Sequence, residues 1–348
     1  MVIRLKNKVI TRESPPFVIA EIGNNHQGEL ATAIEMVKTA KLCGADAVKF
    51  QKRHNKSLYT KALYDQVYDN PDSFGVTYGA HREAIELDEA EFIELKKYCE
   101  DIGIEFMCTA FDFKSVDFLE SIGISSFKIA SGDLHSLHFL EHVAKFGKPM
   151  FVSTGAATLE DVHRAYDTIK QHNDQICIMQ CTATYPADYH MLNLNVIKTY
   201  LKEFPDAVVG YSGHDWGILA PSVARILGAT VFEKHFTLNR ALKGTDHKFS
   251  LEPPGLQKVV RDLKRVDMAL GTHAKTVHDS EKNVKRKMGK SIYYAKNLKA
   301  GAIITKDNIT IKCPFDGISA SEFKHFIGKK LLVDVKEDDP LQHSHFKS

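Results

Sequence analysis

The stretch PMFVSTGAATLEDVHRAYDTIKQHNDQICIMQCT, residues 149–182, decides the fold class of this 348-residue chain. It starts with a short apolar run, continues with a segment over 158–170 whose apolar residues recur every three or four positions, and ends with a second apolar run at 176–182. Such runs are typical of buried strands, and the spacing between them is typical of an amphipathic helix. The stretch therefore predicts a strand, a helix and a second strand.

The same unit repeats along most of the chain. Strands are expected at residues 17–23, 46–51, 105–111, 126–132, 149–155, 176–182, 208–214 and 231–237. Helices are expected at residues 30–42, 89–102, 114–122, 137–145, 158–170, 194–202, 217–227 and 256–270. Apolar strands that alternate with helices predict a parallel sheet covered by helices. A closed (β/α)₈ TIM barrel is favoured over a Rossmann-like sheet, because no GxGxxG follows the first strand.

Two segments interrupt this rhythm. The connection 52–88 is long and rich in tyrosine, which favours equally a lid over the barrel or a surface excursion with its own short helix. Residues 271–290 are polar and basic without clear periodicity and are interpreted as a linker. We therefore expect a barrel domain over residues 1–270 and, after the linker, a small and mostly β domain over residues 291–348.

Composition excludes several classes of protein. The 46 Lys and Arg residues against 44 Asp and Glu leave a net charge of +2, too balanced for a nucleic-acid coat. No apolar run is long enough to cross a membrane, and no signal peptide is visible, so a cytoplasmic location is expected. The six cysteines are scattered without a CxxC pair and are expected to be free thiols.

In a TIM barrel the carboxyl ends of the strands form the active face. Polar and ionisable residues gather at these ends in this chain, Thr109, Thr154, Thr182 and Lys234 among them. The candidates for chemistry there are Glu21, Lys49, Gln51, Lys128, Ser131, Asp133, Ser153, Tyr185, Ser212, His214, His235 and Asp246, and His247 in the loop after the last strand could also contact substrate. Lys49 and Lys128, together with the serines, suit a small ligand that carries phosphate and carboxylate. The alternative is that each lysine only caps a strand or neutralises an acidic neighbour.

His214 and His235 end two successive strands, so both imidazoles could reach one divalent ion. Two histidines with a nearby carboxylate suit Mn²⁺, Zn²⁺ or Fe²⁺. The alternative is two structural histidines inside strands. Glu21, Asp133 and Asp246 are the carboxylates available to complete a coordination sphere or to move protons.

Several of these segments resemble the sialic acid synthase family. The matching motifs are AEIGNNHQG (20–28), KFQK (49–52), FKIASGD (127–133), STG (153–155), QCTATYP (180–186), GYSGH (210–214), EKHFT (233–237) and KGTDHKFSLEP (243–253). The tail segments 289–312 and 327–341 resemble the antifreeze-like SAF domain that follows the barrel in that family. The resemblance covers nearly the whole chain and favours an enzyme.

The resemblance implies a transferase that condenses phosphoenolpyruvate with N-acetylmannosamine, or its 6-phosphate, to a nine-carbon α-keto acid sugar and phosphate. It assigns phosphoenolpyruvate to Lys49, Lys128, Ser131, Ser153 and Ser212. It assigns a divalent metal, typically Mn²⁺ with Mg²⁺ or Co²⁺ as alternatives, to His214 and His235. It places the sugar at Gln51, Tyr185 and Asp246, and the reacting centre near Glu21 and Asp133. It also implies a domain-exchanged homodimer.

Some positions depart from bacterial relatives that use the unphosphorylated sugar. Ala183 replaces an asparagine, Asp133 replaces a glutamate, and Cys313 stands where the SAF domain offers an arginine. These departures leave the acceptor open, with mannose 6-phosphate or a 2,4-diacetamido-6-deoxy sugar as alternatives. A metal-dependent barrel aldolase and a non-catalytic sugar-binding relative are further alternatives, which the SAF-like tail and the retained histidines and lysines respectively disfavour.

Overall fold

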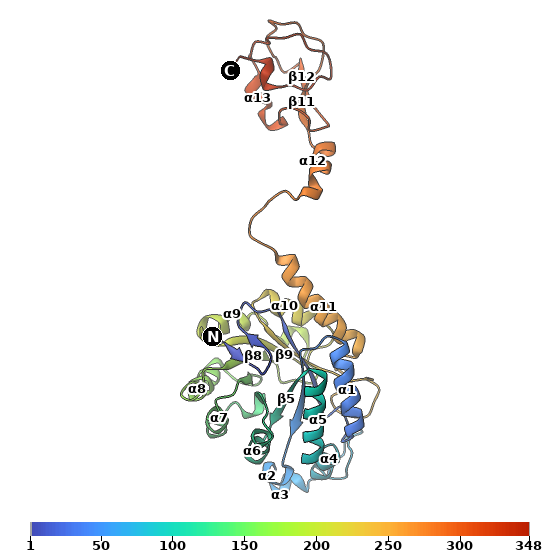
Figure 1. Cartoon of the computed structure of the whole chain (residues 1–348), viewed down its shortest axis with the longest axis vertical. Coiled ribbons are helices and arrows are strands. Elements are labelled where there is room, and N and C mark those ends of the chain that lie inside the picture. The colour runs from blue at the N-terminus through green and yellow to red at the C-terminus, as the bar shows by residue number, and fades with distance from the viewer. Residues whose placement is uncertain (1, 348) are drawn as a thin grey trace. The chain divides into compact units, whose positions relative to one another are not determined.

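The computed structural model describes residues 2–347, which form two units, one ending at Gly271 and the other beginning at Thr272 (Figure 1). Eight parallel strands close into a barrel in the first unit, so the predicted TIM-barrel fold is confirmed. In barrel order from β3 the strands are β3 (Phe17–Gly23), β4 (Ala47–Lys52), β5 (Glu105–Ala110), β6 (Phe127–Ile129), β7 (Met150–Ser153), β8 (Ile176–Cys181), β9 (Val208–Gly213) and β10 (Val231–His235). Pairing of β10 with β3 closes the ring.

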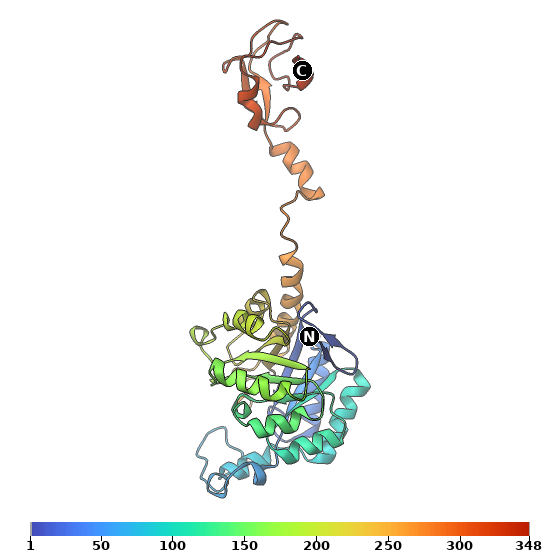
Figure 2. The same cartoon turned by 90° about the vertical axis from the view of Figure 1, so that its left-hand side faces the viewer.

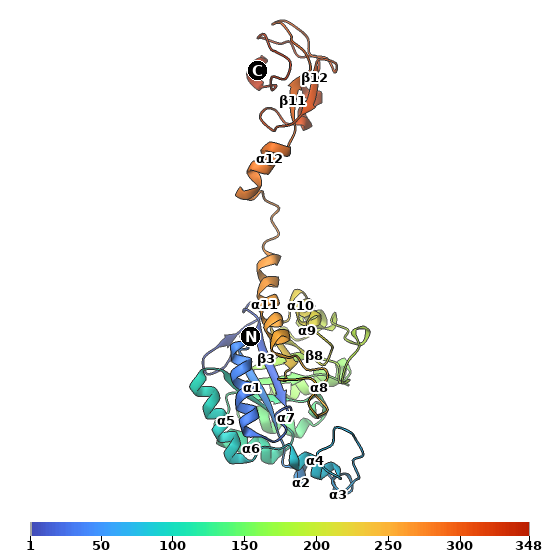
Figure 3. The ribbon, with the colours of Figure 1, turned by 90° about the vertical axis from the view of Figure 1, so that its right-hand side faces the viewer.

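Helices surround the barrel, as the views from its two opposite sides show (Figures 2 and 3). They are α1 (Leu30–Leu42), α5 (Glu89–Ile102), α6 (Phe113–Ser121), α7 (Leu137–Ala144), α8 (Leu159–Lys170), α9 (Val196–Glu203), α10 (Leu219–Ile226) and α11 (Pro253–Leu270). Their apolar sides and the outward side chains of the strands form one buried core. None of the helices in residues 2–347 has the length and apolar character needed to cross a membrane.

Local sequence explains where these helices begin. Asp88 caps α5 with its carboxylate on the backbone N–H of Glu91, and Glu91 bonds back to the N–H of Asp88, which is a capping box. Helix α11 begins at Pro253, three residues before the expected start, because proline at the first helical position loses no hydrogen bond. Strand β6 ends at Ile129, earlier than expected, and a 3₁₀ turn at Ser131–Asp133 follows it.

A short hairpin precedes the barrel and was not expected from the sequence. Its strands, β1 (Ile3–Arg4) and β2 (Val9–Ile10), contribute Ile3 and Ile10 to a second apolar cluster with inward side chains of the barrel, such as Met107. The hairpin lies at the amino-terminal end of the barrel, opposite the segment that carries α2, α3 and α4 (Figures 1 and 3). It therefore closes the barrel interior at the end away from the expected site.

The connection 52–88 holds three short helices, α2 (Asn55–Leu58), α3 (Lys61–Tyr64) and α4 (Tyr78–Ala84). The aromatic rings of this connection pack on one another, with the Tyr59 and Tyr78 centroids 5.1 Å apart. This connection is therefore an ordered element at the carboxyl end of the barrel, where it can contribute to a site.

The second unit has its own small apolar core. It contains α12 (Lys282–Met288), an antiparallel pair of β11 (Ser291–Tyr294) and β12 (Ile309–Lys312), and α13 (Phe323–Phe326). The rest of its β structure consists of isolated bridges, such as Leu331 with Phe346. The segment interpreted as an aperiodic linker therefore includes a short helix, whose basic residues are solvated.

The hairpin offers a direct test of the core at the closed end of the barrel. Ile10 is 1% exposed, whereas its neighbour Val9 is 51% exposed. We expect Ile10→Ala to lower the free energy of unfolding by about 2–5 kcal/mol, the usual cost of a buried Ile-to-Ala cavity. The matched control Val9→Ala is expected to change it by less than about 0.5 kcal/mol. Urea unfolding measures both values, and equal effects would contradict the packing described.

Candidate active site

A cavity of about 790 Å³ opens at the carboxyl ends of the barrel strands. All twelve candidate residues line its wall: Glu21, Lys49, Gln51, Lys128, Ser131, Asp133, Ser153, Tyr185, Ser212, His214, His235 and Asp246. Barrel closure explains this convergence, because it brings the ends of strands that are far apart in sequence to one rim. The structure therefore joins the residues that the sequence singled out.

Two lysines and two glutamates form a buried ionic array at the base of this cavity. Lys49 Nζ lies 2.6 Å from Glu21 Oε2 and 3.6 Å from Glu233 Oε1. Lys128 Nζ also lies 3.6 Å from Glu233 Oε1, and Lys49 donates a hydrogen bond to the Thr109 hydroxyl (2.8 Å). All four charged residues are at most 4% exposed. The carboxylates thus hold two ammonium groups together in the barrel interior.

The two glutamates of the array differ in proton affinity. Burial opposes the charge on Glu233, but the charges of Lys128 and Lys49 outweigh it and lower the Glu233 pKa to about 2. Burial raises the pKa of Glu21 more than Lys49 lowers it, and the negative charge of Glu233 raises it further. Glu233 is therefore the more firmly ionised of the two carboxylates.

Several buried polar atoms on the cavity wall have no hydrogen-bond partner among residues 2–347. They are Arg53 Nη1, Asp133 Oδ2, Ser153 Oγ, Glu233 Oε2 and His235 Nδ1. Unpartnered buried polar atoms are costly and rare in folded proteins. Their concentration on one wall indicates a surface shaped to bind a polar ligand.

The three serines near the lysines differ in the hydrogen bonds that their hydroxyl groups make. Ser212 donates to Glu233 Oε1 (3.2 Å), and the Ser131 hydroxyl accepts from the backbone N–H of Gly155 (2.9 Å). The Ser153 hydroxyl is one of the unpartnered atoms. A bound anion could therefore accept from Ser153 without breaking an existing contact.

His214 and His235 lie side by side, with ring centroids 5.3 Å apart. His214 Nδ1 donates to the Thr182 carbonyl (2.8 Å), and this contact leaves Nε2 as the ring nitrogen available to a metal ion. Burial lowers the pKa of His235 to about 4, so this ring is neutral at pH 7. No cluster of three or more His, Cys, Asp or Glu side chains able to hold a metal occurs in the described part of the chain. His214 and His235 can therefore offer two nitrogen ligands to a metal ion.

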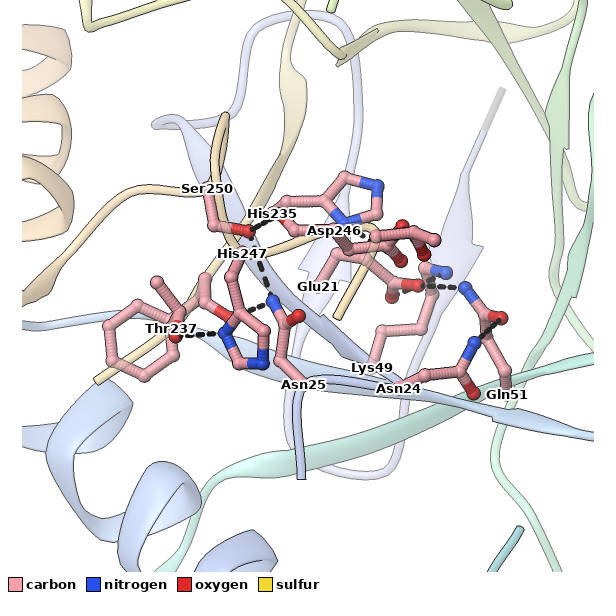
Figure 4. A network of polar contacts seen from close by, with 12 residues as sticks. Glu21, Asn24, Asn25, Lys49, Gln51, His235, Thr237, Asp246, His247 and Ser250 are labelled. Carbon is pink, nitrogen blue, oxygen red and sulfur yellow. Dashed lines mark hydrogen bonds and ion pairs between the residues drawn. The ribbon is translucent and has the colours of Figure 1, made fainter. Parts of the chain in front are cut away.

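A polar network joins the first strand to the loop after the last strand (Figure 4). Gln51 donates to Glu21 Oε1 (2.8 Å), and Asp246 Oδ2 lies 3.8 Å from His235 Nδ1. His247, which the sequence also suggested could contact substrate, instead contacts Thr237 Oγ1 through Nδ1 (2.7 Å) and is not part of the cavity wall. The loop therefore contributes Asp246 to the cavity and uses His247 to hold itself in place.

The alternation of side chains along β10 accounts for the position of Glu233, a cavity residue that the sequence interpretation missed. Glu233 and His235 face into the barrel, whereas Lys234 between them faces the helices and bonds to Asp215 Oδ1 (2.8 Å). Side chains alternate between the two faces of a strand, so His235 in the cavity implies Glu233 beside it. Arg53 and Arg82 were also missed, and Arg82 reaches the cavity from the long connection, where strand periodicity gives no signal.

A family model described as the NeuB family matches residues 36–275, and a SAF domain model matches residues 289–347. The chain belongs to the NeuB family. Human N-acetylneuraminate-9-phosphate synthase is 39% identical over 94% of this chain and 92% of its own length. The N,N'-diacetyllegionaminic acid synthase of Legionella pneumophila is 36% identical over 95% of each chain.

The fold of this NeuB-family protein is also similar to that of a solved structure. N-acetylneuraminic acid (sialic acid) synthetase from Leptospira borgpetersenii superposes with a TM-score of 0.71 at 30% identity, covering 82% of this chain and 95% of that one. Together with the sequence relatives, it supports an enzyme of the sialic-acid-type synthase class.

The buried ion pair of Lys234 with Asp215 allows a test of what stabilises the barrel wall of this NeuB-family protein. Asp215 is 0% exposed, and it accepts both from Lys234 Nζ and from the Tyr211 hydroxyl (2.6 Å). We expect Asp215→Asn to lower the free energy of unfolding by about 3–5 kcal/mol, because it leaves a buried ammonium group unpaired.

Two further variants complete this test. Adding Lys234→Met to Asp215→Asn is expected to restore much of the lost stability, because the unpaired charge is removed. Asp174→Asn, which breaks the exposed pair with Lys170, is the control and is expected to cost less than about 1 kcal/mol. Denaturant unfolding measures all three, and a double variant no more stable than Asp215→Asn alone would contradict the pairing.

Proposed function

We propose that this protein condenses phosphoenolpyruvate with N-acetylmannosamine or its 6-phosphate, forming a sialic acid (a nonulosonic acid) and inorganic phosphate. The observation that carries the proposal is the pair of buried lysines, Lys49 and Lys128, in a cavity with unpartnered polar atoms. The names of the sequence relatives support the product class.

Phosphoenolpyruvate carries a phosphate and a carboxylate, which match two ammonium groups and nearby hydroxyls. In the proposal Lys49 and Lys128 bind these groups, and Ser131, Ser153 and Ser212 fix their orientation. Glu233 remains ionised and keeps the two lysines together when the site is empty. The lysines also stabilise the phosphate as it departs, since its charge grows when the C–O bond breaks.

The acceptor sugar would lie against Gln51, Tyr185 and Asp246 on the outer part of the wall. The two imidazoles fit a divalent cation, because His214 presents a free Nε2 and His235 Nδ1 is buried without a hydrogen-bond partner. His214 and His235 would hold this cation, for which Mn²⁺ is our first expectation. When bound, it would polarise the carbonyl of the open-chain sugar.

Asp133 takes part in the proton transfers, and Glu21 keeps Lys49 in place beside the reacting centre. C3 of phosphoenolpyruvate forms a bond to the aldehyde carbon, and the aldehyde oxygen takes a proton from solvent. Water then adds at C2, and Asp133 accepts its proton. Collapse of the tetrahedral centre breaks the C2–O bond and releases phosphate. Atoms balance as phosphoenolpyruvate, sugar and water giving the α-keto acid and phosphate.

We further propose that the protein acts as a domain-exchanged homodimer, in which the small domain of one subunit serves the barrel of the other. The second unit has only a small apolar core, which favours a domain that leans on another surface.

Phosphate release tests the reaction directly. The protein is incubated with phosphoenolpyruvate and, in turn, N-acetylmannosamine, its 6-phosphate, mannose 6-phosphate or a 2,4-diacetamido-6-deoxy sugar, with Mn²⁺ or with a chelator. We expect acceptor-dependent release that the chelator abolishes, and loss of release in His214→Ala and His235→Ala. The exposed His190→Ala is the control. No release with any acceptor would overturn the synthase assignment, and release insensitive to chelator would overturn the metal.

The pH dependence tests the role of Asp133. Burial raises the pKa of this carboxyl to about 6, so its base form disappears as the pH falls below 6. We therefore expect kcat/KM for the preferred acceptor to fall on the acid side with an apparent pKa near 6. Asp133→Asn should lower kcat/KM by about 100-fold or more and remove this limb. An unchanged acid limb in the variant would assign it to another group.

A further inference from the structure

Two arginines on the cavity wall are not used by the chemistry described above. Arg53 follows β4 directly, and Arg82 lies on α4 within the connection 52–88. Arg53 is 7% exposed, and its guanidinium stacks on Phe111 with Cζ 3.8 Å from the ring centroid. Arg82 is half-buried. The connection 52–88 therefore places a second guanidinium group, that of Arg82, on the same cavity wall as the buried Arg53.

The hydrogen-bond partners of both guanidinium groups are neutral. Arg53 Nη2 donates to Gln51 Oε1 (2.6 Å), while Nη1 is buried without an acceptor. Arg82 Nε and Nη2 both donate to the Tyr78 hydroxyl, at 3.1 and 3.0 Å. These contacts use some of the N–H donors of the two guanidinium groups, but they place no negative charge beside either group.

Nearby carboxylates are paired with other groups. Glu86 pairs with Lys52 (3.0 Å) and Asp72 with Lys248 (3.0 Å). The ion pairs formed within residues 2–347 include neither Arg53 nor Arg82. The remaining cavity carboxylates, Asp133 and Asp246, act on these arginines only from beyond ion-pair distance.

The buried Arg53 guanidinium is electrostatically unfavourable on its own, whereas at Arg82 the effect of burial is outweighed by Tyr78 and Tyr59, and the pKa is raised. Burial lowers the pKa of Arg53, and the neighbouring charge of Arg82 lowers it further. Removing a charge from water costs several kcal/mol unless a partner compensates for it. An anion that sits between the two guanidiniums would supply that partner.

We propose that Arg53 and Arg82 bind the phosphate of a phosphorylated acceptor, so that the sugar used by this protein is a hexosamine 6-phosphate. This inference rests on the proposed function and selects among its acceptors. A phosphomonoester carries close to two negative charges at pH 7, and its oxygens match the planar donor fork of arginine. Phosphoenolpyruvate already has Lys49 and Lys128 at the base of the cavity, and an unphosphorylated sugar offers no charge to a second cationic site.

The test compares two acceptors that differ only in the phosphate. Phosphate release is measured with N-acetylmannosamine 6-phosphate and with N-acetylmannosamine in the native protein, Arg82→Gln and Arg53→Lys. We expect the native protein to prefer the phosphorylated sugar. In Arg82→Gln the ratio of the two kcat/KM values should fall by about 10- to 100-fold, the loss expected for a charged hydrogen bond, mainly through KM.

Controls separate this inference from its alternatives. Arg265→Gln, on the exposed side of α11, is expected to match the native protein. Arg53→Lys keeps the charge at the buried position, and its thermal melting reports whether the fold is intact. An unchanged ratio in Arg82→Gln would overturn the inference. A rise in the KM for phosphoenolpyruvate with an unchanged ratio would assign the arginines to that substrate instead.

Direct binding distinguishes failure of this inference from failure of the proposed function. Calorimetry measures binding of N-acetylmannosamine 6-phosphate and of N-acetylmannosamine to the protein without turnover. We expect the phosphorylated sugar to bind at least about tenfold more tightly, and Arg82→Gln to remove the difference. That result would support the phosphate site even if no phosphate were released. Equal affinities in the native protein would overturn it.

Discussion

The buried ionic array of Lys49, Lys128, Glu21 and Glu233 is the interaction on which the candidate site depends. Charges removed from water are tolerated only when opposite charges and hydrogen bonds compensate for them. The four residues come from β4, β6, β3 and β10, and only a closed barrel brings these strands to one rim. Barrel closure, the apolar cluster that contains Ile3 and Ile10, and the outward pairing of Lys234 with Asp215 stabilise the barrel wall that carries these four residues.

The cavity separates its charges into regions with different tasks. The lysines and glutamates at the base neutralise one another, and the two histidines lie apart from them, with His235 beside Asp246. The arginines lie where the long connection meets the wall, without carboxylate partners among the described residues. Each region suits one part of a two-substrate condensation: an anionic donor, a polarised carbonyl and a second anionic group. In the function we propose, this division would let a chain with a net charge of only +2 bind highly charged substrates.

Much of this organisation is predictable from sequence, because strand and helix periodicities are local and their eightfold repetition specifies a barrel. Most of the twelve candidates could be found for the same reason, since they lie at or just beyond the strand ends, and Asp246 lies in the polar loop after the last strand. Glu233 was missed although alternation with His235 placed it inward. Arg82 was beyond reach, because its place at the cavity depends on how a connection of three short helices folds back over the rim. The hairpin before the barrel was missed because two-residue strands carry no periodicity.

The central claim is that the lysine pair is a platform for the phosphate and carboxylate of phosphoenolpyruvate. A crystal structure of the protein with phosphoenolpyruvate and Mn²⁺ tests it most directly. We predict density for the phosphate or carboxylate within hydrogen-bonding distance of both Lys49 and Lys128, in contact with the Ser153 hydroxyl, and an anomalous signal for Mn²⁺ beside His214 and His235. Phosphoenolpyruvate bound elsewhere, with the two lysines still paired only to Glu21 and Glu233, would contradict the claim.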